Sequence, residues 1–191
     1  MAKAVSPRGT ARDRVLSAAS ALFAENGVNG TSLQMVADRL AISKASVYFQ
    51  FKTKEEMVIS AVRPVFDDLA RVVAIATELP SSQARRDGAV VGLVELVVRN
   101  RSLSAVFFGD PAISALVRCH PKFEETLDKL DTLIAGPRPD SATRVAVSMV
   151  TAGICSGTTD PRLRDVADDE LRRELIQNSQ RCLQQLPERQ P

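Results

Sequence analysis

The sequence predicts an all-α protein in which an N-terminal helix-turn-helix unit of three helices precedes a larger helical domain. Apolar residues recur at helical spacing along most of the chain. Three helix start signals follow one another between residues 31 and 56. The composition is rich in Ala, Val and Leu and contains no Trp, which favours helices. A chain of 191 residues is long enough to bury a sizeable core in one or two domains.

The first predicted helix ends near Gly27. In the stretch RDRVLSAASALFAENGV, from residue 12 to residue 28, the apolar side chains share one helical stripe: Val15, Leu16, Ala19, Leu22 and Phe23. Gly27 is placed to adopt a left-handed conformation at the helix end, and Val28 can then pack on Phe23 as in a Schellman motif.

Two short helices are predicted next. Thr31 and Gln34 form a capping box at the start of the second helix. The apolar face of that helix contains Leu33, Val36, Ala37 and Leu40. Ser43 is placed to cap the third helix, and Ile42 and Val47 form a hydrophobic staple around it.

The stretch YFQFK, from Tyr48 to Lys52, alternates bulky and polar residues as a half-buried strand does. The start signals at Ser43 and at Thr53, which has Glu56 three residues later, indicate instead the end of one helix and the head of another. In this arrangement Ile42, Val47 and Phe51 face the core. The outer face of the third helix contains Lys44, Ala45, Tyr48 and Phe49.

A short helix, a tight turn and a second short helix packed on a longer one make a helix-turn-helix unit, and one of these helices fits the major groove of DNA. The charge distribution agrees, because residues 1–63 contain nine Lys or Arg and five acidic residues, whereas the rest of the chain has a net charge of −2. Lys52 and Lys54 lie beside the free N–H groups of the next helix start and form a candidate phosphate site. Solvated lysines are the alternative interpretation.

The stretch from Arg12 to Ala61 resembles the N-terminal domain of TetR-family transcriptional repressors. The block LFAENGVNGTSLQMVADRLAISKASVYFQFKTKEEM carries the resemblance, together with the spacing YxxFxxKE over residues 48–55. The resemblance covers about a quarter of the chain. Ala41 departs from the family pattern, which often has Gly at this turn, and a left-handed conformation there is disfavoured for Ala.

The resemblance implies specific contacts with DNA. Residues on the recognition helix would face bases or nearby phosphates: Ser43, Lys44, Ala45, Ser46 and Phe49. Tyr48 would hydrogen-bond a phosphate with its hydroxyl. Residues at the starts of the second and fourth helices would hold the DNA backbone: Thr31, Ser32, Gln34 and Lys54. The resemblance also implies a flexible basic arm, residues 1–11, with Arg8 and Arg12 reaching the duplex.

Residues 54–191 are predicted to form a helical domain that follows a DNA-binding domain of residues 1–53. The predicted helices cover residues 55–78, 83–101, 111–118, 121–134, 141–157 and 168–186. Pro64 lies inside the first of these helices and is expected to kink it or to mark a local break. Glu95 has Arg99 four residues later, which predicts a surface ion pair; a buried acid that faces a ligand is the alternative.

Helical C-terminal domains of TetR-like proteins hold an inducer pocket and a dimer interface. The resemblance therefore implies a small-molecule effector and a homodimer formed through residues 141–157 and 168–186. The candidate pocket residues are Phe66, Leu69, Leu93, Leu96, Phe107, Phe108, Val117, Phe123 and Met149. Core packing is the competing interpretation of these side chains. His120, the one histidine, is expected to lie at a helix end, and a contact with a polar ligand group is the alternative.

An enzyme is not expected, because the chain has no GxSxG motif, no glycine-rich phosphate loop and no HExxH motif. No cofactor or metal is expected either. Cys119, Cys155 and Cys182 are widely spaced and are predicted to be reduced and mostly buried. No signal peptide and no membrane-spanning stretch is recognised, which predicts a cytoplasmic protein without membrane contact.

Together these features predict a ligand-responsive transcriptional regulator. It would be a repressor that binds a near-palindromic operator in double-stranded DNA as a dimer and that a small hydrophobic effector releases. The alternative is an architectural or constitutive helix-turn-helix DNA-binding protein without a small-molecule ligand.

Overall fold

The computed structural model describes residues 8–101 and 110–184, and within these ranges the chain forms helices and no strands. The predicted all-α fold class is confirmed. The helices are α1 (Arg8–Gly30), α2 (Leu33–Leu40), α3 (Lys44–Gln50), α4 (Lys54–Thr77), α5 (Ser82–Arg99), α7 (Pro111–Arg118), α8 (Pro121–Ala135), α9 (Ser141–Gly157) and α10 (Asp168–Gln184). A short 3-10 helix, Pro161–Leu163, lies between α9 and α10.

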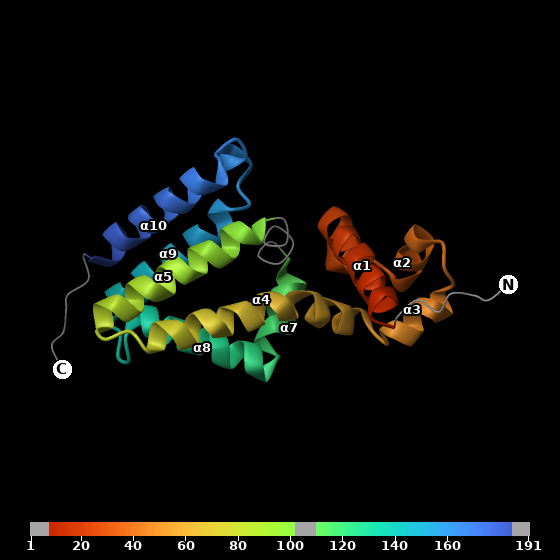
Figure 1. Ribbon diagram of the computed structural model, residues 1–191, viewed down its shortest axis with the longest axis horizontal. Helices are drawn as coiled ribbons and strands as arrows, with labels where there is room; N and C mark the ends of the chain where they lie inside the picture. Colours follow the sequence, from red (N-terminus) through yellow and green to blue (C-terminus); the bar gives the residue numbers. More distant parts are fainter. Residues whose placement is uncertain (1–7, 102–109, 185–191) are drawn as a thin grey trace.

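The helices form two groups at opposite ends of an elongated molecule (Figure 1). One end consists of α1, α2 and α3, and the bundle at the other end contains α5, α8, α9 and α10. The 24-residue helix α4 runs from the first group into the second. Pro64 lies inside α4 and does not divide it into two helices, so the predicted local break is not found.

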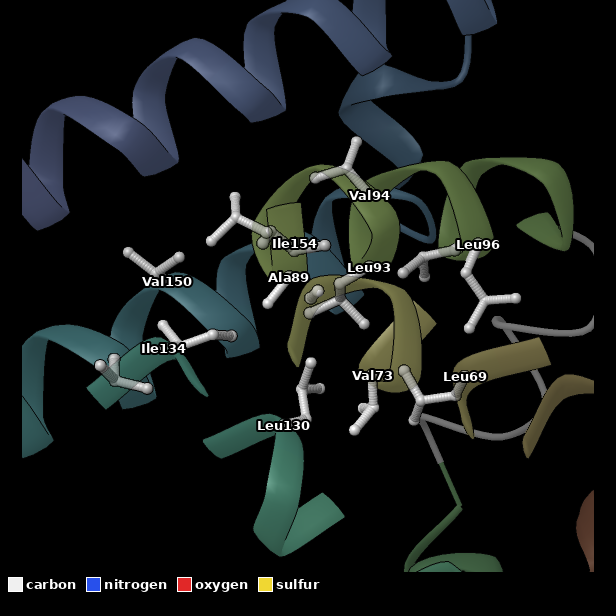
Figure 2. Close-up of a cluster of buried hydrophobic side chains, with 14 of the residues drawn as sticks. Leu69, Val73, Ala89, Leu93, Val94, Leu96, Leu130, Ile134, Val150 and Ile154 are labelled. Atoms are coloured by element: carbon white, nitrogen blue, oxygen red, sulfur yellow. The ribbon is translucent and has the colours of Figure 1, made fainter. Parts of the chain in front are cut away.

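Each group of helices has a buried apolar core. The N-terminal core includes Val47 and Phe51 of the third-helix region, and also Met57 and Val58 of α4. The second core, part of which is drawn in Figure 2, is built from side chains of α4, α5, α8, α9 and α10. Phe66 packs against both cores. Because the N-terminal core continues into α4, it extends beyond residue 53, and a domain boundary between residues 53 and 54 stays a prediction.

Helical geometry breaks at Gly27 with the expected positive φ, but the predicted left-handed Schellman ending is not formed, because ψ lies far from the left-handed value and the N–H of Val28 bonds to Asp110. This glycine has φ +70° and ψ 167°, although helical hydrogen bonding is assigned as far as Gly30. Val28 and Phe23 are 3% and 2% exposed and lie in the same core. The positive φ turns the chain so that an apolar residue just after the helix can return to the core.

The capping box predicted from Thr31 is wrong. Ser32 caps α2, and its Oγ accepts a hydrogen bond of 3.2 Å from the N–H of Met35. Thr31 is 3% exposed, and its hydroxyl donates to the carbonyls of Leu22 (3.1 Å) and Gly27 (2.8 Å). The free carbonyls at the end of α1 therefore bind the Thr31 hydroxyl, and the cap moves one residue along the chain.

The ion pair predicted between Glu95 and Arg99 is also wrong. Arg99 pairs with Asp68 of α4 at 2.6 Å, and Glu95 pairs with Arg172 of α10 at 2.9 Å. The side chain of Glu95 is half exposed, so it is not a buried acid either. Since α5 packs against both α4 and α10, partners on neighbouring helices are closer than the residue four positions along.

The cysteines are free, as expected, but two of the three are not buried. Cys119 ends α7 and Cys182 lies in the last turn of α10, and both are exposed. Cys155 of α9 is half-buried, and this burial raises the pKa of its thiol to about 12. The Cys155 thiol is therefore protonated at neutral pH.

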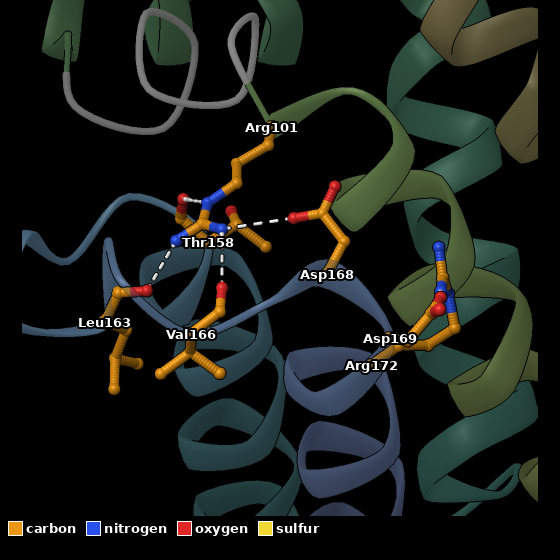
Figure 3. Close-up of polar contacts among 7 residues, drawn as sticks. All are labelled: Arg101, Thr158, Leu163, Val166, Asp168, Asp169 and Arg172. Carbon is orange, nitrogen blue, oxygen red and sulfur yellow. Dashed lines mark hydrogen bonds and ion pairs between the residues drawn. The ribbon is translucent and has the colours of Figure 1, made fainter.

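Arg101 holds the connection between α9 and α10 (Figure 3). Its guanidinium donates from Nε to the carbonyl of Thr158 (2.9 Å) and from Nη2 to the carbonyl of Leu163 (2.7 Å). Nη1 contacts the carboxylate of Asp168 at 3.1 Å and the carbonyl of Val166 at 3.4 Å. One side chain thus satisfies backbone carbonyls beyond α9 and the first carboxylate of α10, which fixes where α10 starts.

The turn between α2 and α3 depends on a left-handed alanine. Ala41 has φ 52° and ψ 43°, and it is the one non-glycine residue with positive φ in residues 8–101 and 110–184. Its N–H donates to the carbonyl of Asp38 (3.1 Å), and the N–H of Ile42 donates to that of Ala37 (3.0 Å). These bonds close α2 and turn the chain sharply toward α3.

Ala41→Gly should therefore stabilise the protein. The substitution removes the steric cost of a left-handed Ala, roughly 1–2 kcal/mol, and adds the greater chain entropy of Gly in the unfolded state. We expect the free energy of unfolding, measured by urea denaturation with circular dichroism, to rise by about 0.5–1 kcal/mol. Ala45→Gly, at a right-handed helical position of α3, is the matched control and should lower it by about as much. A lower stability for Ala41→Gly would contradict the role assigned to the turn.

Candidate nucleic-acid interface

The third helix, α3, is short and is held in place by its neighbours. It has seven residues, too few to be stable alone in water. Ser43 caps it, because its Oγ accepts a hydrogen bond of 3.1 Å from the N–H of Ser46. Val47 and Phe51 are fully buried between α3 and its neighbours. The predicted cap and the inward direction of Val47 and Phe51 are confirmed, whereas Ile42, which was also expected to face the core, is 37% exposed.

Arg12 of α1 closes the packing around the end of α3. Its guanidinium lies 3.9 Å from the centre of the Phe51 ring and donates to the carbonyl of Gln50. The same group contacts Glu56 Oε1 at 3.2 Å and Ser60 Oγ at 3.3 Å on α4. Arg12 therefore ties three helices together. The expectation that Arg12 reaches the duplex is not supported, because its guanidinium is used within the fold.

Part of the predicted basic arm is helical instead. Helix α1 begins at Arg8, so residues 8–11, which were assigned to an arm of residues 1–11, form the first turn of this helix. The remaining part of that arm, residues 1–7, and the side chain of Arg8 lie outside what the structure describes.

The face of α3 opposite the core is exposed and carries two adjacent aromatic rings. Tyr48 is 51% exposed and Phe49 is 75% exposed. Lys44 and Ala45 lie on the same open side and are exposed as well. A phenylalanine this exposed on a protein with a well-filled core indicates a surface that contacts another molecule.

A lysine lies next to both rings. The ammonium group of Lys52 is 4.9 Å from the centre of the Tyr48 ring and 5.9 Å from that of Phe49. These are distances at which a cation is attracted to an aromatic ring. The surface formed by Lys44, Ala45, Tyr48, Phe49 and Lys52, called the α3 surface below, is therefore both apolar and positively charged.

The start of α4 adds a third lysine, Lys54, close in sequence to the α3 surface. Thr53 caps α4, and its Oγ1 accepts a hydrogen bond of 3.1 Å from the N–H of Glu56. Nζ of Lys54 donates to the carbonyl of Thr31 at 3.2 Å. An ammonium group has three protons, so this contact aims Lys54 and leaves two donors for a phosphate.

Glu56, an acid close to Lys52, is already paired within the fold. Hydrogen bonding from the backbone N–H of Lys52, with a further contribution from Arg12, lowers the pKa of Glu56. Glu56 therefore stays ionised, and its charge interacts with both Arg12 and Lys52. Arg39 is used in the same way, because it makes a bidentate pair with Glu25 (2.8 and 2.7 Å) that joins α2 to α1.

The three residues expected to hold DNA from the start of α2 are placed differently from one another. Ser32 is exposed beside the open end of the helix. Gln34 is exposed and donates to Asp38 at 2.7 Å. Thr31 is buried, with its hydroxyl bonded inside the protein, so its side chain is not part of the surface.

The candidate ligand residues do not form one group. Phe66 and Phe123 stack with their ring centres 4.2 Å apart, and Val117 is half-buried against the N-terminal core. Leu69, Leu93 and Leu96 are buried in the second core. Met149 is 70% exposed on α9, in an open hollow lined by α9 side chains alone. Phe107 and Phe108 lie outside the described residues.

His120 extends the aromatic pair. Its ring stacks on Phe123 at 4.0 Å between ring centres. It precedes α8 as the N-cap residue but makes no side-chain cap, and its Nδ1 is buried without a hydrogen-bond partner among the described residues. The helix-end position is confirmed. The unpartnered nitrogen is consistent with the alternative interpretation, in which His120 contacts a polar group of a ligand where the two cores meet.

One contact between the start of α7 and the end of α1 was not anticipated. Asp110 caps α7 by accepting from the N–H of Ala112 (2.8 Å), and its other oxygen accepts from the N–H of Val28 (2.8 Å). The Asp-Pro sequence before α7 was a usable signal for the cap. The link to α1 depends on tertiary structure, which no local pattern reports.

Two further properties of the described part of the chain bear on its chemistry. No three His, Cys, Asp or Glu side chains there are grouped so as to hold a metal ion. Among the helices that the structure describes, none has the length and apolar character that a bilayer span requires.

Comparison with known proteins identifies the N-terminal part of the chain. The family model described as bacterial regulatory proteins, tetR family, matches residues 15–61, which include α2, α3 and most of α1. The chain is 30% identical over 102 residues to the HTH-type transcriptional repressor KstR2 of Mycolicibacterium smegmatis. That match covers 53% of this chain and 49% of KstR2, so it spans about half the length of this relative.

The whole fold has counterparts among solved structures. A TetR-like transcriptional regulator from Rhodococcus sp. RHA1 superposes with a TM-score of 0.70 at 18% identity, over 95% of this chain and all of the other. FadR from Bacillus subtilis, solved in complex with stearoyl-CoA, gives 0.60 at 19% identity, over 90% and 95% of the two chains. Both proteins are described as transcriptional regulators. The N-terminal segment of this chain belongs to the TetR family of bacterial regulatory proteins, and the chain as a whole has the fold of TetR-family transcriptional regulators.

Proposed function

We propose that this protein is a transcriptional repressor that binds a near-palindromic operator in double-stranded DNA as a homodimer. The α3 surface is the observation that carries the proposal. It is a short helix held from behind by Val47 and Phe51, with exposed aromatic and basic side chains on its open face. A helix displayed in this way fits the major groove, and the adjacent lysines suit the phosphates.

The proposed contacts follow from where each side chain lies. Lys44, Ala45 and Phe49 enter the groove, and Ser43 and Ser46 lie near its edge. The hydroxyl of Tyr48 donates to a phosphate. Lys52, Lys54, Ser32 and Gln34 hold the DNA backbone on either side of α3. Thr31 is withdrawn from this set because its side chain is buried.

The homodimer is proposed to form through α9 and α10. The outer side of α9 exposes Val145 (59%) and Met149 (70%) among small residues that allow two helices to approach closely. Arg101 holds the connection from the C-terminal end of α9 to the start of α10. A two-fold axis there would place two copies of α3 on one side of a duplex, with their half-sites about one helical turn apart.

The response to an effector is proposed to arise where the two cores meet. Phe66 belongs to both cores and stacks on Phe123, and the unpartnered nitrogen of His120 is adjacent. The complex of FadR with stearoyl-CoA shows that a protein of this fold can bind a long acyl chain. We propose a small hydrophobic effector that separates these side chains, shifts α4 and Asp110, and so moves α3.

Tyr48→Phe and Lys54→Ala should both weaken binding to a duplex that the full-length protein selects from a random library. In a dimer, Lys54→Ala removes one phosphate contact per chain. The slope of log K against log salt concentration should therefore fall in magnitude by about 2. Tyr48→Phe should lower the affinity without changing that slope, because a neutral hydrogen bond is lost. The measurement is a gel-shift titration at several salt concentrations.

Lys129→Ala, on the body helix α8, is the matched control and should leave the affinity and the slope unchanged. Because Lys54 also donates to Thr31, the thermal unfolding midpoint of each variant is measured alongside. Unchanged affinities for both Tyr48→Phe and Lys54→Ala would contradict the phosphate contacts.

A hydrophobic ligand should release the protein from that duplex. The probes are a series of fatty acids and their acyl-CoA thioesters of increasing chain length, each tested by gel shift and by thermal shift. Phe66→Leu, at the meeting point of the two cores, should keep DNA binding and lose release. Absence of binding by every probe would favour the alternative, a constitutive or architectural DNA-binding protein without a ligand.

A further inference from the structure

We infer that Ala45 and Phe49 read the C5-methyl groups of thymines, so that each half-site carries thymine at the positions beneath these two side chains. The inference rests on the proposed function and adds to it the chemistry of sequence recognition. It begins from how few hydrogen-bonding groups α3 offers to a base.

Most polar side chains of α3 are already occupied. The hydroxyls of Ser43 and Ser46 are 2.8 Å apart and hydrogen-bond each other, and Ser43 also accepts from the N–H of Ser46. Gln50 is half-buried at the last turn, against the N-terminal helix α1. The remaining candidates for a hydrogen bond to a base edge are Lys44, which is exposed, and the one O–H of the serine pair that the pair itself does not use.

The centre of the open face is apolar instead. Ala45 and Phe49 are four residues apart, which places them on one side of the helix, and both are exposed. They are separated by about 6 Å along the helix axis, close to two base-pair steps of about 3.4 Å. In the major groove, the apolar group that a base pair presents is the thymine methyl. The two apolar side chains therefore match two thymines within about two steps of each other.

The positive charge on the open face of α3 favours DNA over another protein as the binding partner. Lys52 lies within 6 Å of the Phe49 ring centre, and Lys44 is on the same open side. A second protein surface that covered Phe49 would have to accommodate both cations, whereas a duplex supplies phosphates for the lysines beside methyl groups for the ring. The Lys52 ammonium also limits the positions that the Phe49 ring can adopt, which prepares it for contact.

The test uses the full-length protein and the tightest duplex that it selects from a random library. Each thymine of one half-site is replaced in turn by deoxyuridine, which pairs identically and lacks only the methyl group. One or two positions should each lose about fourfold in affinity, the value of one buried methyl, and more than tenfold when both half-sites are changed. The other thymines should show no loss.

Variants assign the methyl groups to side chains. In Phe49→Ala the deoxyuridine penalty should disappear at one position and persist at the other, and Ala45→Gly should show the reverse pattern. Phe49→Leu keeps an apolar group and should keep part of the penalty. Because Phe49 is exposed, its variants should unfold at nearly the wild-type temperature, whereas Ala45→Gly should remain folded but unfold at a somewhat lower temperature, since Gly weakens α3.

The outcomes separate the inference from the proposed function. The methyl-reading role is overturned if a sequence is selected but no deoxyuridine substitution lowers the affinity. It is also overturned if the deoxyuridine penalties in Phe49→Ala equal those of the wild type. In both cases the proposed function as a DNA-binding regulator still stands. If the selected half-site lacks thymine, the inference fails in the same way. If no sequence is enriched at all, the proposed function falls and the inference with it.

Discussion

The burial of Val47 and Phe51 is the constraint on which the rest of the structure depends. A seven-residue helix has little stability of its own, so α3 exists because these two side chains fill the N-terminal core. Arg12 strengthens the same attachment by lying on the Phe51 ring and binding the end of α3. Once that side of a short helix is fixed inward, Tyr48 and Phe49 have no place in the core and must face solvent. The α3 surface is thus a consequence of packing behind it.

The long helix α4 makes this surface part of the whole molecule. Its first turns complete the N-terminal core, and its later turns belong to the core of the bundle. Phe66 touches both cores, and Asp110 joins α7 to the turn that ends α1 through the N–H of Val28. A change in the packing around Phe66 and Phe123 therefore has a short physical route to α3. In the proposed regulator, the same route would couple an effector to DNA release.

The sequence predicted features that depend on a few neighbouring residues, and it missed contacts between residues on different helices. Caps such as Ser43 and Thr53, and the inward direction of Phe51, follow from spacing along a few residues, and they are confirmed. The partners of Arg12 and Glu95, and the link from Asp110 to α1, depend on which helices meet, so no local pattern contains them. The cap of α2 moved from Thr31 to Ser32 for a similar reason, because the end of α1 competes for the Thr31 hydroxyl. The candidate pocket residues are spread over two cores and the surface. Helical spacing shows which apolar side chains share one face of a helix, but it does not show which other helix that face contacts.

Photo-crosslinking from α3 tests the central claim, that its open face enters the major groove, most directly. A p-benzoylphenylalanine is placed at Phe49, and in a second protein at Ile75, which is similarly exposed (68%) but lies near the other end of α4. Irradiation of the complex with the selected duplex should link position 49 to bases at two places about 10 base pairs apart and should link position 75 to none. Crosslinks from position 75, with none from position 49, would contradict the account.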